Sequence, residues 1–373
     1  MICQSIWVKN FRNIEEQEVF FGEGVNLLVG KNAQGKTNLL EAIFYPSVGR
    51  SFRGAHTPEI IRFGESRAQI LLSYRDQRRN QRIGVTLFRD RQRLVEKNGL
   101  KMDRLSDLMG SFRAVLFCPE HLSMIQNGPS ARRSYMDMAI SRMSPSYMRS
   151  LQTYGVLLRQ RNALIKSAYG NRAAFDATVE LWSQRLAEEA ARISAQRLAF
   201  IRRIESHVAT CFSEMTGERE IPTLRYDGSS GQEEEEYQDR ERVKKKYVQL
   251  LMSAHDREIS AGATLWGIHK DDIDIRLNGR SARNFASQGQ QRSLALAMKL
   301  AEGEICREEF GDYPVFLLDD VLSELDGGRR EYVLHRIRQK QVILTGCDPD
   351  LLGEHREVRR ILVEDGRYRE EAL

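Results

Sequence analysis

One loop near the N-terminus carries the residues of a phosphate-binding site. The stretch GKNAQGKT matches the pattern G-x-x-x-x-G-K-[ST] at every fixed position. Glycines at both ends let the backbone curl so that its N–H groups point inward, where they bind phosphate oxygens. The lysine would reach the β- and γ-phosphates, and the hydroxyl of the threonine would bind Mg²⁺. The residues assigned to this nucleotide site are Gly30, Lys31, Asn32, Ala33, Gln34, Gly35, Lys36 and Thr37.

The alternative is a glycine turn that meets this pattern by chance, and the flanking sequence argues against it. An apolar strand is expected over residues 25–29, and a helix is expected from about Lys36, with Leu39, Leu40 and Ile43 on its apolar face. Strand, loop and helix in that order are the context that the motif requires. The sequence therefore predicts a site for a nucleoside triphosphate, with Lys36 among its catalytic residues.

Two aspartates far downstream are predicted to complete this site. Asp319 and Asp320 follow the apolar run 315–318, which reads as a buried strand. A carboxylate at the end of such a strand organises Mg²⁺ in P-loop folds, so Asp319 is assigned to the metal together with Thr37. Asp320 would then orient or deprotonate the attacking water. Read alone, the two aspartates could simply begin a turn; the P-loop upstream favours the metal site.

A second anion cradle is possible at the start of a later helix. In the stretch SQGQQRSLALA, a hydroxyl and a flexible glycine precede an apolar helical stripe, and a helix N-terminus of this kind can bind anions. The alternative is a plain N-cap, which would be the better reading if the motif stood alone. The residues in question are Ser287, Gly289 and Gln290.

Composition restricts the class of protein. The chain has 373 residues, 41% of them hydrophobic and 29% charged, which suits two globular domains with a substantial core. No apolar run approaches the roughly 20 residues of a membrane helix, and the N-terminus lacks a signal-peptide profile. The five cysteines contain no C-x-x-C pair, which argues against disulfides or zinc. We expect a cytoplasmic protein, and its net charge of +5 permits nucleic-acid binding without requiring it.

The chain is expected to form three consecutive segments, 1–125, 126–256 and 257–373. The first and last contain strands, and Asn-Gly pairs at 98–99 and 278–279 indicate tight hairpins. The middle segment has apolar residues at helical spacing, and we expect a helical hairpin with arms of about 40 residues each. Its acidic block 233–236 and the lysines at 244–246 read as one solvated helix, or alternatively as a contact surface for DNA or a partner.

These motifs resemble those of a known superfamily. SQGQQRSLALA resembles the signature motif of ABC-type ATPases, and LLDDVLSELD resembles their Walker B motif and D-loop. More narrowly, VKNFRNIEEQEVFF, LLVGKNAQGKTNLLEAI, FCPEHLSMIQNGPSARRSYMDM and GIHKDDIDI resemble the RecF family of bacterial recombination mediators, in family order over nearly the whole chain. The resemblance implies an α/β fold: a P-loop ABC-type ATPase head formed from both chain ends, with an inserted, mainly α-helical arm domain.

The resemblance also implies a function. It implies an ATP-dependent homodimer that binds duplex DNA near gaps and helps to load recombinase, with RecO and RecR as partners and no membrane. Ser287, Gly289 and Gln290 of one subunit would contact the γ-phosphate of ATP held by the other. Arg50 and Arg53 are candidates for phosphate or DNA contacts, with a plain surface role equally open.

Two departures from the ABC pattern bear on turnover. Asp320 stands where most ABC ATPases have glutamate, and Gly346 stands where transporters have a switch histidine. A shorter carboxylate and a missing histidine both indicate a weak ATPase.

Three other classes fit the sequence less well. The nucleotide-binding subunit of an ABC transporter would normally carry the switch histidine that Gly346 replaces. A long-armed chromosome-organising ATPase would need hundreds of coiled-coil residues. An ATPase-coupled nuclease would need a further carboxylate-rich metal domain, for which 373 residues leave no segment.

Overall fold

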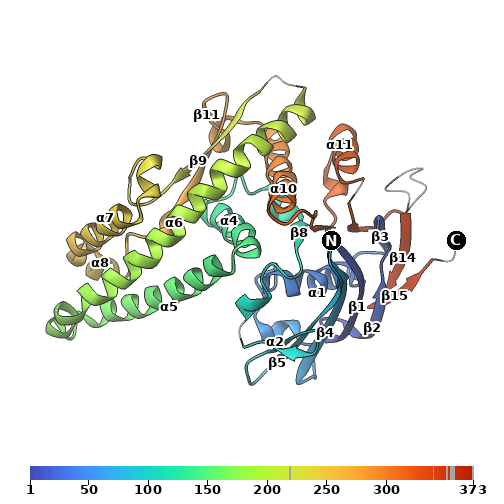
Figure 1. Ribbon diagram of the computed structural model, residues 1–373, viewed down its shortest axis with the longest axis horizontal. Helices are drawn as coiled ribbons and strands as arrows, with labels where there is room; N and C mark the ends of the chain where they lie inside the picture. Colours follow the sequence, from blue (N-terminus) through green and yellow to red (C-terminus); the bar gives the residue numbers. More distant parts are fainter. Residues whose placement is uncertain (104, 218–219, 339, 350–351, 353–357, 372–373) are drawn as a thin grey trace. The chain divides into compact units, whose positions relative to one another are not determined.

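The computed structural model describes residues 1–103, 105–217, 220–338, 340–349, 352 and 358–371 (Figure 1). The chain separates into two compact units. Residues 1–123 and 295–373 form the first, which we call the head unit, and residues 124–294 form the second, the arm unit. The predicted α/β head built from both chain ends, with a mainly helical insertion, is confirmed.

A six-stranded sheet in the head unit carries the P-loop strand near its centre. The five parallel strands share one orientation, so their carboxyl ends lie at the same edge, where α/β folds bind ligands. Most of their residues are buried, as expected for strands covered on both faces. The order is β15 (Arg367–Glu370), β14 (Val358–Glu364), β3 (Val25–Val29), β13 (Val342–Gly346), β12 (Val315–Leu318) and β8 (Ala114–Phe117), with β15 antiparallel to β14.

The second sheet of the head unit is antiparallel and built from the N-terminal strands. The Asn98–Gly99 turn has positive φ at both residues, 53° and 80°, which confirms the predicted tight hairpin. The order is β2 (Ile14–Phe20), β1 (Ile2–Phe11), β4 (Arg67–Arg75), β5 (Asn80–Phe88), β6 (Leu94–Lys97) and β7 (Leu100–Lys101).

Helix α1 (Lys36–Val48) packs against strands of both sheets. The sequence predicted an amphipathic helix here, yet nearly all of its side chains are buried, including the polar Glu41 and Ser47. A helix enclosed on all sides needs no polar face. Glu41 is satisfied inside by a two-pronged pair with Arg12, at 2.9 Å for each bond. The head unit also contains the short helices α2 (Thr57–Ile60) and α3 (Pro119–Leu122), and α11 (Gly327–Ile337).

Three helices of the arm unit form a layer in which α6 lies between α5 and α7 (Figure 1). Helix α5 (Pro145–Ser167) begins at the predicted proline, and the hydroxyl of Ser144 accepts from the amide of Tyr147 at 3.2 Å as an N-cap. Helix α6 (Arg172–Thr216) has 45 residues and a length of about 67 Å. The predicted equal arms are wrong: the chain before α6 is divided between α4 (Pro129–Met143) and the 23 residues of α5.

The acidic block and the lysines that follow it do not form one helix. Residues Glu234–Gln238 form a 3₁₀ turn, and α7 (Arg240–Ser253) begins after Asp239, whose carboxylate accepts from the amide of Arg242 at 3.1 Å. The helix begins after Asp239 and not in the glutamate block, because the short aspartate side chain reaches the first free amides of a helix as an N-cap. A short helix, α8 (His255–Ala261), follows.

The second boundary between the units falls at 294/295, whereas the sequence placed it at 256/257. The cause is a small antiparallel sheet that the arm unit builds from strands on both sides of the expected boundary. Strand β9 (Pro222–Asp227) pairs along its whole length with β10 (Asp272–Leu277), which continues through the 278–279 turn into β11 (Arg280–Ser281). A short helix, α9 (Ala282–Phe285), follows, and the boundary then lies within α10 (Gln288–Phe310).

A buried ionic cluster fixes the turn that precedes β10. Arg197 of α6 is 1% exposed, and its guanidinium donates to Asp271 at 2.8 Å and to Asp137 at 2.9 Å. It also donates to the carbonyl of Ile268 at 2.8 Å, so this one side chain of α6 binds both α4 and the turn at 268–271. At Gly267 (φ 139°) any Cβ would lie 2.2 Å from the hydroxyl of Tyr154. The GIHKDD stretch is therefore held in place by buried contacts within the arm unit.

None of the helices in the described part of the chain combines the length and apolar character that crossing a bilayer requires.

Candidate nucleotide site

The P-loop connects the carboxyl end of β3 to the N-terminus of α1 and requires glycine at two points. A Cβ on Gly30 would lie 2.3 Å from the carbonyl oxygen of Val363 in the neighbouring strand β14. Gly35 has φ 113°, and its Cβ would lie within 3 Å of both amide atoms of Asn13. The two fixed glycines of the motif are thus explained by close packing at one and by backbone conformation at the other.

Segments from both ends of the chain hold the middle of this loop. The turn between β14 and β15 donates two backbone N–H groups to Gln34: that of Gly366 to its carbonyl at 2.9 Å and that of Asp365 to its side-chain oxygen at 2.6 Å. On the other side, the amide of Asn13 in the β1–β2 turn donates to the same carbonyl at 3.2 Å. None of these residues was predicted to lie at the site from the sequence, although Asp365-Gly366 is a tight-turn dipeptide.

The side chain of Lys36 turns into the inside of the loop and is 7% exposed. Its ammonium group donates to the carbonyl oxygens of Gly30 and of Lys31, the latter at 3.0 Å. The thiol sulfur of Cys347 lies 3.5 Å away, just past the end of β13. A cation held at this point faces the region where the phosphates of a P-loop nucleotide lie.

Asp319 follows β12, and its carboxylate accepts hydrogen bonds from two hydroxyl groups. Thr37 donates to Oδ1 at 2.8 Å, and Thr345, at the end of β13, donates to the same oxygen at 3.0 Å. Burial raises the pKa of Asp319, the two hydroxyls oppose that shift, and the neighbouring charge of Asp320 adds to it. Thr37 and Asp319, which the sequence assigned to one metal ion, therefore lie in contact, and Thr345 contacts the same carboxylate oxygen.

Asp320 faces a different group. Its backbone is left-handed (φ 51°), its amide donates to the hydroxyl of Thr345 at 2.9 Å, and its carboxylate accepts from Ser323 at 2.9 Å. The two neighbouring aspartates are thus separated in direction, one toward Thr37 and the other toward Ser323. Such a separation allows two different roles.

The oxygen donors at this point fit Mg²⁺. Mg²⁺ is bound in nucleotide sites by one or two carboxylates together with hydroxyl, water and phosphate oxygens. The hydroxyl of Thr37 and the carboxylate of Asp319 are such donors and already lie in contact. Among the residues that the structure describes, no group of three or more His, Cys, Asp and Glu could hold a metal ion without other ligands. The donor set therefore suits a metal that shares its ligands with a nucleotide.

A cavity of about 400 Å³ lies over the loop. Arg53 lines it, and the Nη1 of this arginine donates to Asn38 at 3.2 Å. Both Arg50 and Arg53 are exposed, but Arg50 does not line the cavity. For Arg53 the position favours the phosphate alternative. The lining residues are Asn32, Ala33, Gln34, Gly35, Lys36, Thr37, Asn38, Arg53, Asp320 and Thr345.

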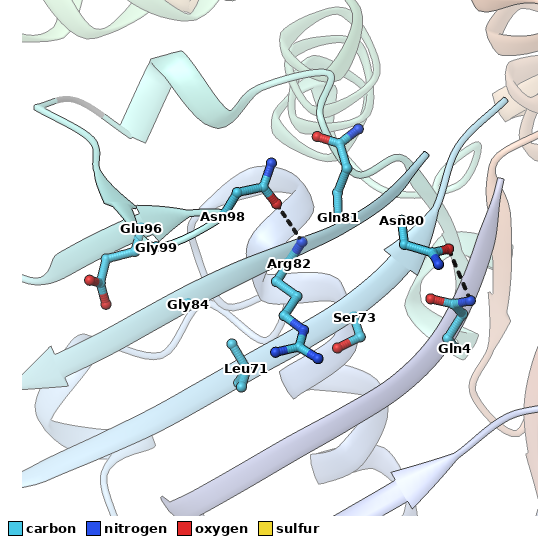
Figure 2. Close-up of a pocket in the computed structure, with 10 residues that line it drawn as sticks. All are labelled: Gln4, Leu71, Ser73, Asn80, Gln81, Arg82, Gly84, Glu96, Asn98 and Gly99. Carbon is cyan, nitrogen blue, oxygen red and sulfur yellow. Dashed lines mark hydrogen bonds between the residues drawn. The ribbon is translucent and has the colours of Figure 1, made fainter. Parts of the chain in front are cut away.

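Another hollow, of about 690 Å³, lies on the exposed face of the antiparallel sheet (Figure 2). The side-chain amide of Gln4 on β1 donates to Asn80 on β5 at 3.2 Å, and the backbone amide of Arg82 donates to Asn98 at 2.9 Å. Figure 2 shows these residues among the side chains that line the hollow. Its lining has no glycine-rich loop between a strand and a helix. It is therefore a feature of the sheet surface and not a phosphate site.

The predicted signature residues lie in the arm unit, whereas the P-loop, Asp319 and Asp320 lie in the head unit. Ser287 precedes α10 and forms a capping box with Gln290: the amide of Gln290 donates to the hydroxyl at 3.3 Å, and its side-chain oxygen accepts from the amide of Ser287 at 2.6 Å. Glu220 in turn accepts from the side-chain amide of Gln290. The hydroxyl of Ser287 is a genuine N-cap and is exposed. Its role toward a nucleotide stays a prediction.

A glycine loop at the carboxyl edge of a parallel sheet, a lysine inside it and an aspartate after another strand of that sheet define the class of protein. It is a P-loop ATPase head of the ABC type. The family model described as the RecF/RecN/SMC N terminal domain matches residues 2–369.

Relatives of known name narrow this class. The chain is 35% identical to the DNA replication and repair protein RecF of Acetivibrio thermocellus, over 98% of this chain and 99% of that protein. It is 36% identical to RecF of Shouchella clausii, over 95% and 96%. The chain belongs to the RecF family of DNA replication and repair proteins, and this membership disfavours the transporter alternative.

Solved structures agree. The recombination mediator protein RecF-ATPrS in the RecFOR pathway superposes with a TM-score of 0.92 at 33% identity, over 99% of this chain and 98% of that one. The corresponding RecF-ATP structure gives 0.86 at 33% identity, over 99% of both chains. An Smc head domain from Pyrococcus furiosus superposes with a TM-score of 0.56 at 14% identity, over 100% of this chain and 96% of that one. At this identity the likeness shows a shared fold alone.

Proposed function

We propose that this protein is an ATP-dependent DNA-binding protein of recombinational repair and replication, in which ATP binding drives dimerisation and slow hydrolysis reverses it. The observation that carries the proposal is the contact between Thr37 of the P-loop helix and Asp319 of β12 at 2.8 Å. Two segments 282 residues apart thereby present a hydroxyl and a carboxylate at one point beside a buried lysine. That combination suits a magnesium–triphosphate and has no evident use in packing alone.

In this proposal each residue of the candidate nucleotide site has a defined role when ATP binds. The N–H groups of the P-loop bind phosphate oxygens, and Lys36 exchanges its two carbonyl partners for the β- and γ-phosphates. Thr37 and Asp319 would hold Mg²⁺, which neutralises phosphate charge when bound. Because Gly366, Asp365 and Asn13 fix the loop beforehand, little backbone ordering remains to oppose binding.

Turnover depends on the second aspartate. Asp320 lines the cavity and would orient the attacking water or accept its proton. Ser323 donates to this carboxylate at 2.9 Å and limits its rotation. The shorter reach of aspartate and the glycine at position 346 support a weak ATPase. In this proposal the slow conversion of ATP to ADP returns the dimer to monomers.

Dimerisation would bring a second set of groups to the γ-phosphate. In this proposal Ser287, Gly289 and Gln290 of one subunit contact ATP bound by the other, and exposure of the Ser287 hydroxyl leaves it available. Membership in the RecF family, and the RecFOR pathway named for the solved relative, support DNA as ligand and RecO and RecR as partners in loading recombinase at gaps.

Sedimentation velocity tests the proposal directly. The protein is examined without nucleotide, with ADP–Mg²⁺ and with ATP–Mg²⁺, each with and without gapped duplex DNA. The expected result is a monomer in the first two conditions and a dimer that retains DNA in the third. A sedimentation coefficient that is the same in all three conditions would overturn the dimerisation switch.

A further inference from the structure

The charge of helix α5 distinguishes it from the other long helices. Its 23 residues contain four basic residues and no acidic one. Every other helix of ten or more residues in the described part of the chain contains at least one aspartate or glutamate. A helix that only needs solubility is usually built with both signs of charge, because neighbouring opposite charges stabilise it.

One of the four cations has a structural role and the other three do not. Arg161 is fully buried and donates to Glu258 at 2.7 Å and to Thr264 at 2.9 Å. Arg149, Arg159 and Lys166 are exposed, and none of them forms an ion pair or hydrogen bond with any residue that the structure describes. Their charges are therefore uncompensated by the protein.

The opposite edge of the same helical layer is different. There Lys244 of α7 lies 3.6 Å from Glu188, and Arg242 pairs with Glu236. Glu234 and Glu235 of the 233–236 block each lie 3.8 Å from the guanidinium of Arg202 on α6. The single helix predicted for this segment is absent, but the mixed charges of the 3₁₀ turn and of α7 favour a solvated surface over a contact surface for DNA. Helix α5 forms the other edge of the layer, across α6 from α7 (Figure 1). This edge carries basic residues and no acidic ones.

The spacing of the three cations suits an extended anion. At 1.5 Å per residue, Arg149 and Lys166 are about 25 Å apart along the helix axis, with Arg159 between them. That length corresponds to about seven base pairs of duplex DNA. The same face carries uncharged hydrogen-bonding groups, Gln152 and Gln160, which can donate to phosphate oxygens.

We propose that the exposed face of α5 is a contact surface for the phosphate backbone of duplex DNA. The inference rests on the proposed function, since it assigns a place to the DNA binding that the function requires. Arginine and lysine contacts to phosphates position a duplex without reading its sequence, so binding through α5 is independent of base sequence and strongly dependent on salt.

The test replaces Arg149, Arg159 and Lys166 together by glutamine. Glutamine keeps helix propensity, and the side chains are exposed, so α5 is retained. Affinity for a 30-base-pair duplex is measured by fluorescence anisotropy with ATP–Mg²⁺ over a series of salt concentrations. Losing three phosphate contacts should make the slope of log K against log salt shallower by about 2.7, and lower affinity by about 10²-fold at 0.15 M salt. ATP binding and ATP-driven sedimentation should equal those of the parent protein.

A matched variant controls for net charge. Arg240→Gln, Lys245→Gln and Lys246→Gln on α7 remove the same three charges from the opposite edge, and the salt slope should remain within 1 of the parent value, by the same scale of about 0.9 per contact. Equal losses in the two triple variants, or an unchanged slope in the α5 variant, would overturn the assignment of α5 alone. A parent protein that binds no duplex with ATP would overturn the proposed function and this inference with it.

Discussion

The phenol hydroxyl of Tyr368, five residues from the end of the chain, donates to the carbonyl oxygen of Gly35 at 2.9 Å. Gly35 is the N-cap residue of α1 and has a left-handed backbone, with φ 113° and ψ 4°. Tyr368 is buried on β15, and this burial raises the pKa of its hydroxyl, so it remains a donor at all ordinary pH values. The last strand of the chain thus fixes the geometry of a loop that lies more than 300 residues earlier.

Tyr368→Phe should weaken ATP binding without unfolding the head. The substitution removes one hydrogen bond of about 0.5–1.5 kcal/mol, which corresponds to a two- to tenfold loss of affinity if the bond is needed for the bound geometry. Isothermal titration with ATP–Mg²⁺ measures the loss. Tyr74→Phe, on a buried tyrosine of β4 that does not line the cavity, is the control and should bind as the parent does. Equal affinity in the two variants would show that the loop holds its shape without Tyr368.

Cys347 offers a chemical probe of the same site. It is exposed and lies 3.5 Å from the ammonium of Lys36, whereas Cys3, Cys118, Cys211 and Cys306 are buried. Burial also raises the pKa of the Cys3 and Cys118 thiols, which lowers their reactivity. Iodoacetamide should therefore alkylate Cys347 first, and ATP–Mg²⁺ should slow that reaction, as followed by mass spectrometry of the native protein.

Lys36→Ala is the decisive companion to this labelling experiment. Without the ammonium group, tight ATP binding should be lost while the fold is retained, because the side chain faces the loop and not the apolar core. ATP should then give no protection to Cys347. Full protection in the variant would remove the phosphate site from this loop.

Ser287→Arg tests the predicted role of the signature across a dimer. The arginine would place a bulky cation where the exposed hydroxyl now caps α10, and monomeric ATP binding should stay nearly unchanged because Ser287 lies outside the head unit. ATP-driven dimerisation, measured by sedimentation, should be blocked. Ser287→Asp keeps a good N-cap and serves to separate helix fraying from the loss of the interface. ATP-dependent dimers of the arginine variant would contradict the proposed arrangement.

The stability of the arm unit should depend on pH through His269. Burial lowers the pKa of this imidazole, and the hydrogen bond to Thr264 opposes that shift. The charges of Lys270 and Arg133 also lower the pKa, while that of Asp271 raises it. One ring nitrogen lies 2.7 Å from the hydroxyl of Tyr154 and the other 3.1 Å from the carbonyl of Thr264, an arrangement that the neutral ring satisfies.

Since the folded pKa lies below the unfolded value of about 6.5, the unfolded chain binds more protons between the two values. The free energy of unfolding should therefore be highest above about pH 7 and should fall as the pH drops through about 6.5. Urea unfolding of the parent and of His269→Gln, followed by circular dichroism from pH 5 to 8, measures this. The variant should be less stable at pH 8 and show a smaller decrease toward pH 5; parallel pH curves would exclude His269 as a source of the dependence.

Local sequence was enough to predict the strands and the helix that flank the candidate site. The P-loop pattern predicted the strand at 25–29 and the helix from Lys36, and the apolar run 315–318 predicted β12 with its following aspartates. In each case the motif, the hydrophobic period and the turn residues lie within some 20 residues of one another. Such signals need no knowledge of the tertiary fold.

The parts that the sequence missed are held by long-range contacts. Tyr368, Asn13 and Thr345 reach the site because β15 begins beside it and β1 and β13 end beside it. Nothing in the sequence next to these residues indicates this. The arm boundary was misplaced for the same reason, since residues 222–227 become a strand through pairing with residues 272–277. Strand pairing across 50 residues leaves no periodic mark that one segment alone could show.

Asp320→Asn separates nucleotide binding from turnover. The amide keeps the size of the carboxylate and can still contact Ser323, but it cannot accept a proton from water or orient it by charge. ATP and Mg²⁺ should still bind through Lys36, Thr37 and Asp319, so the closed dimer should form and persist.

Loss of a general base typically lowers the rate by about 10²- to 10⁴-fold, with little effect on binding. Single-turnover hydrolysis should fall by this factor, and DNA should dissociate more slowly than from the parent in ATP and equally fast in ADP. Hydrolysis at the parental rate would exclude Asp320 as the group that positions water, and a variant that stays monomeric would mean that this carboxylate is required to assemble the site.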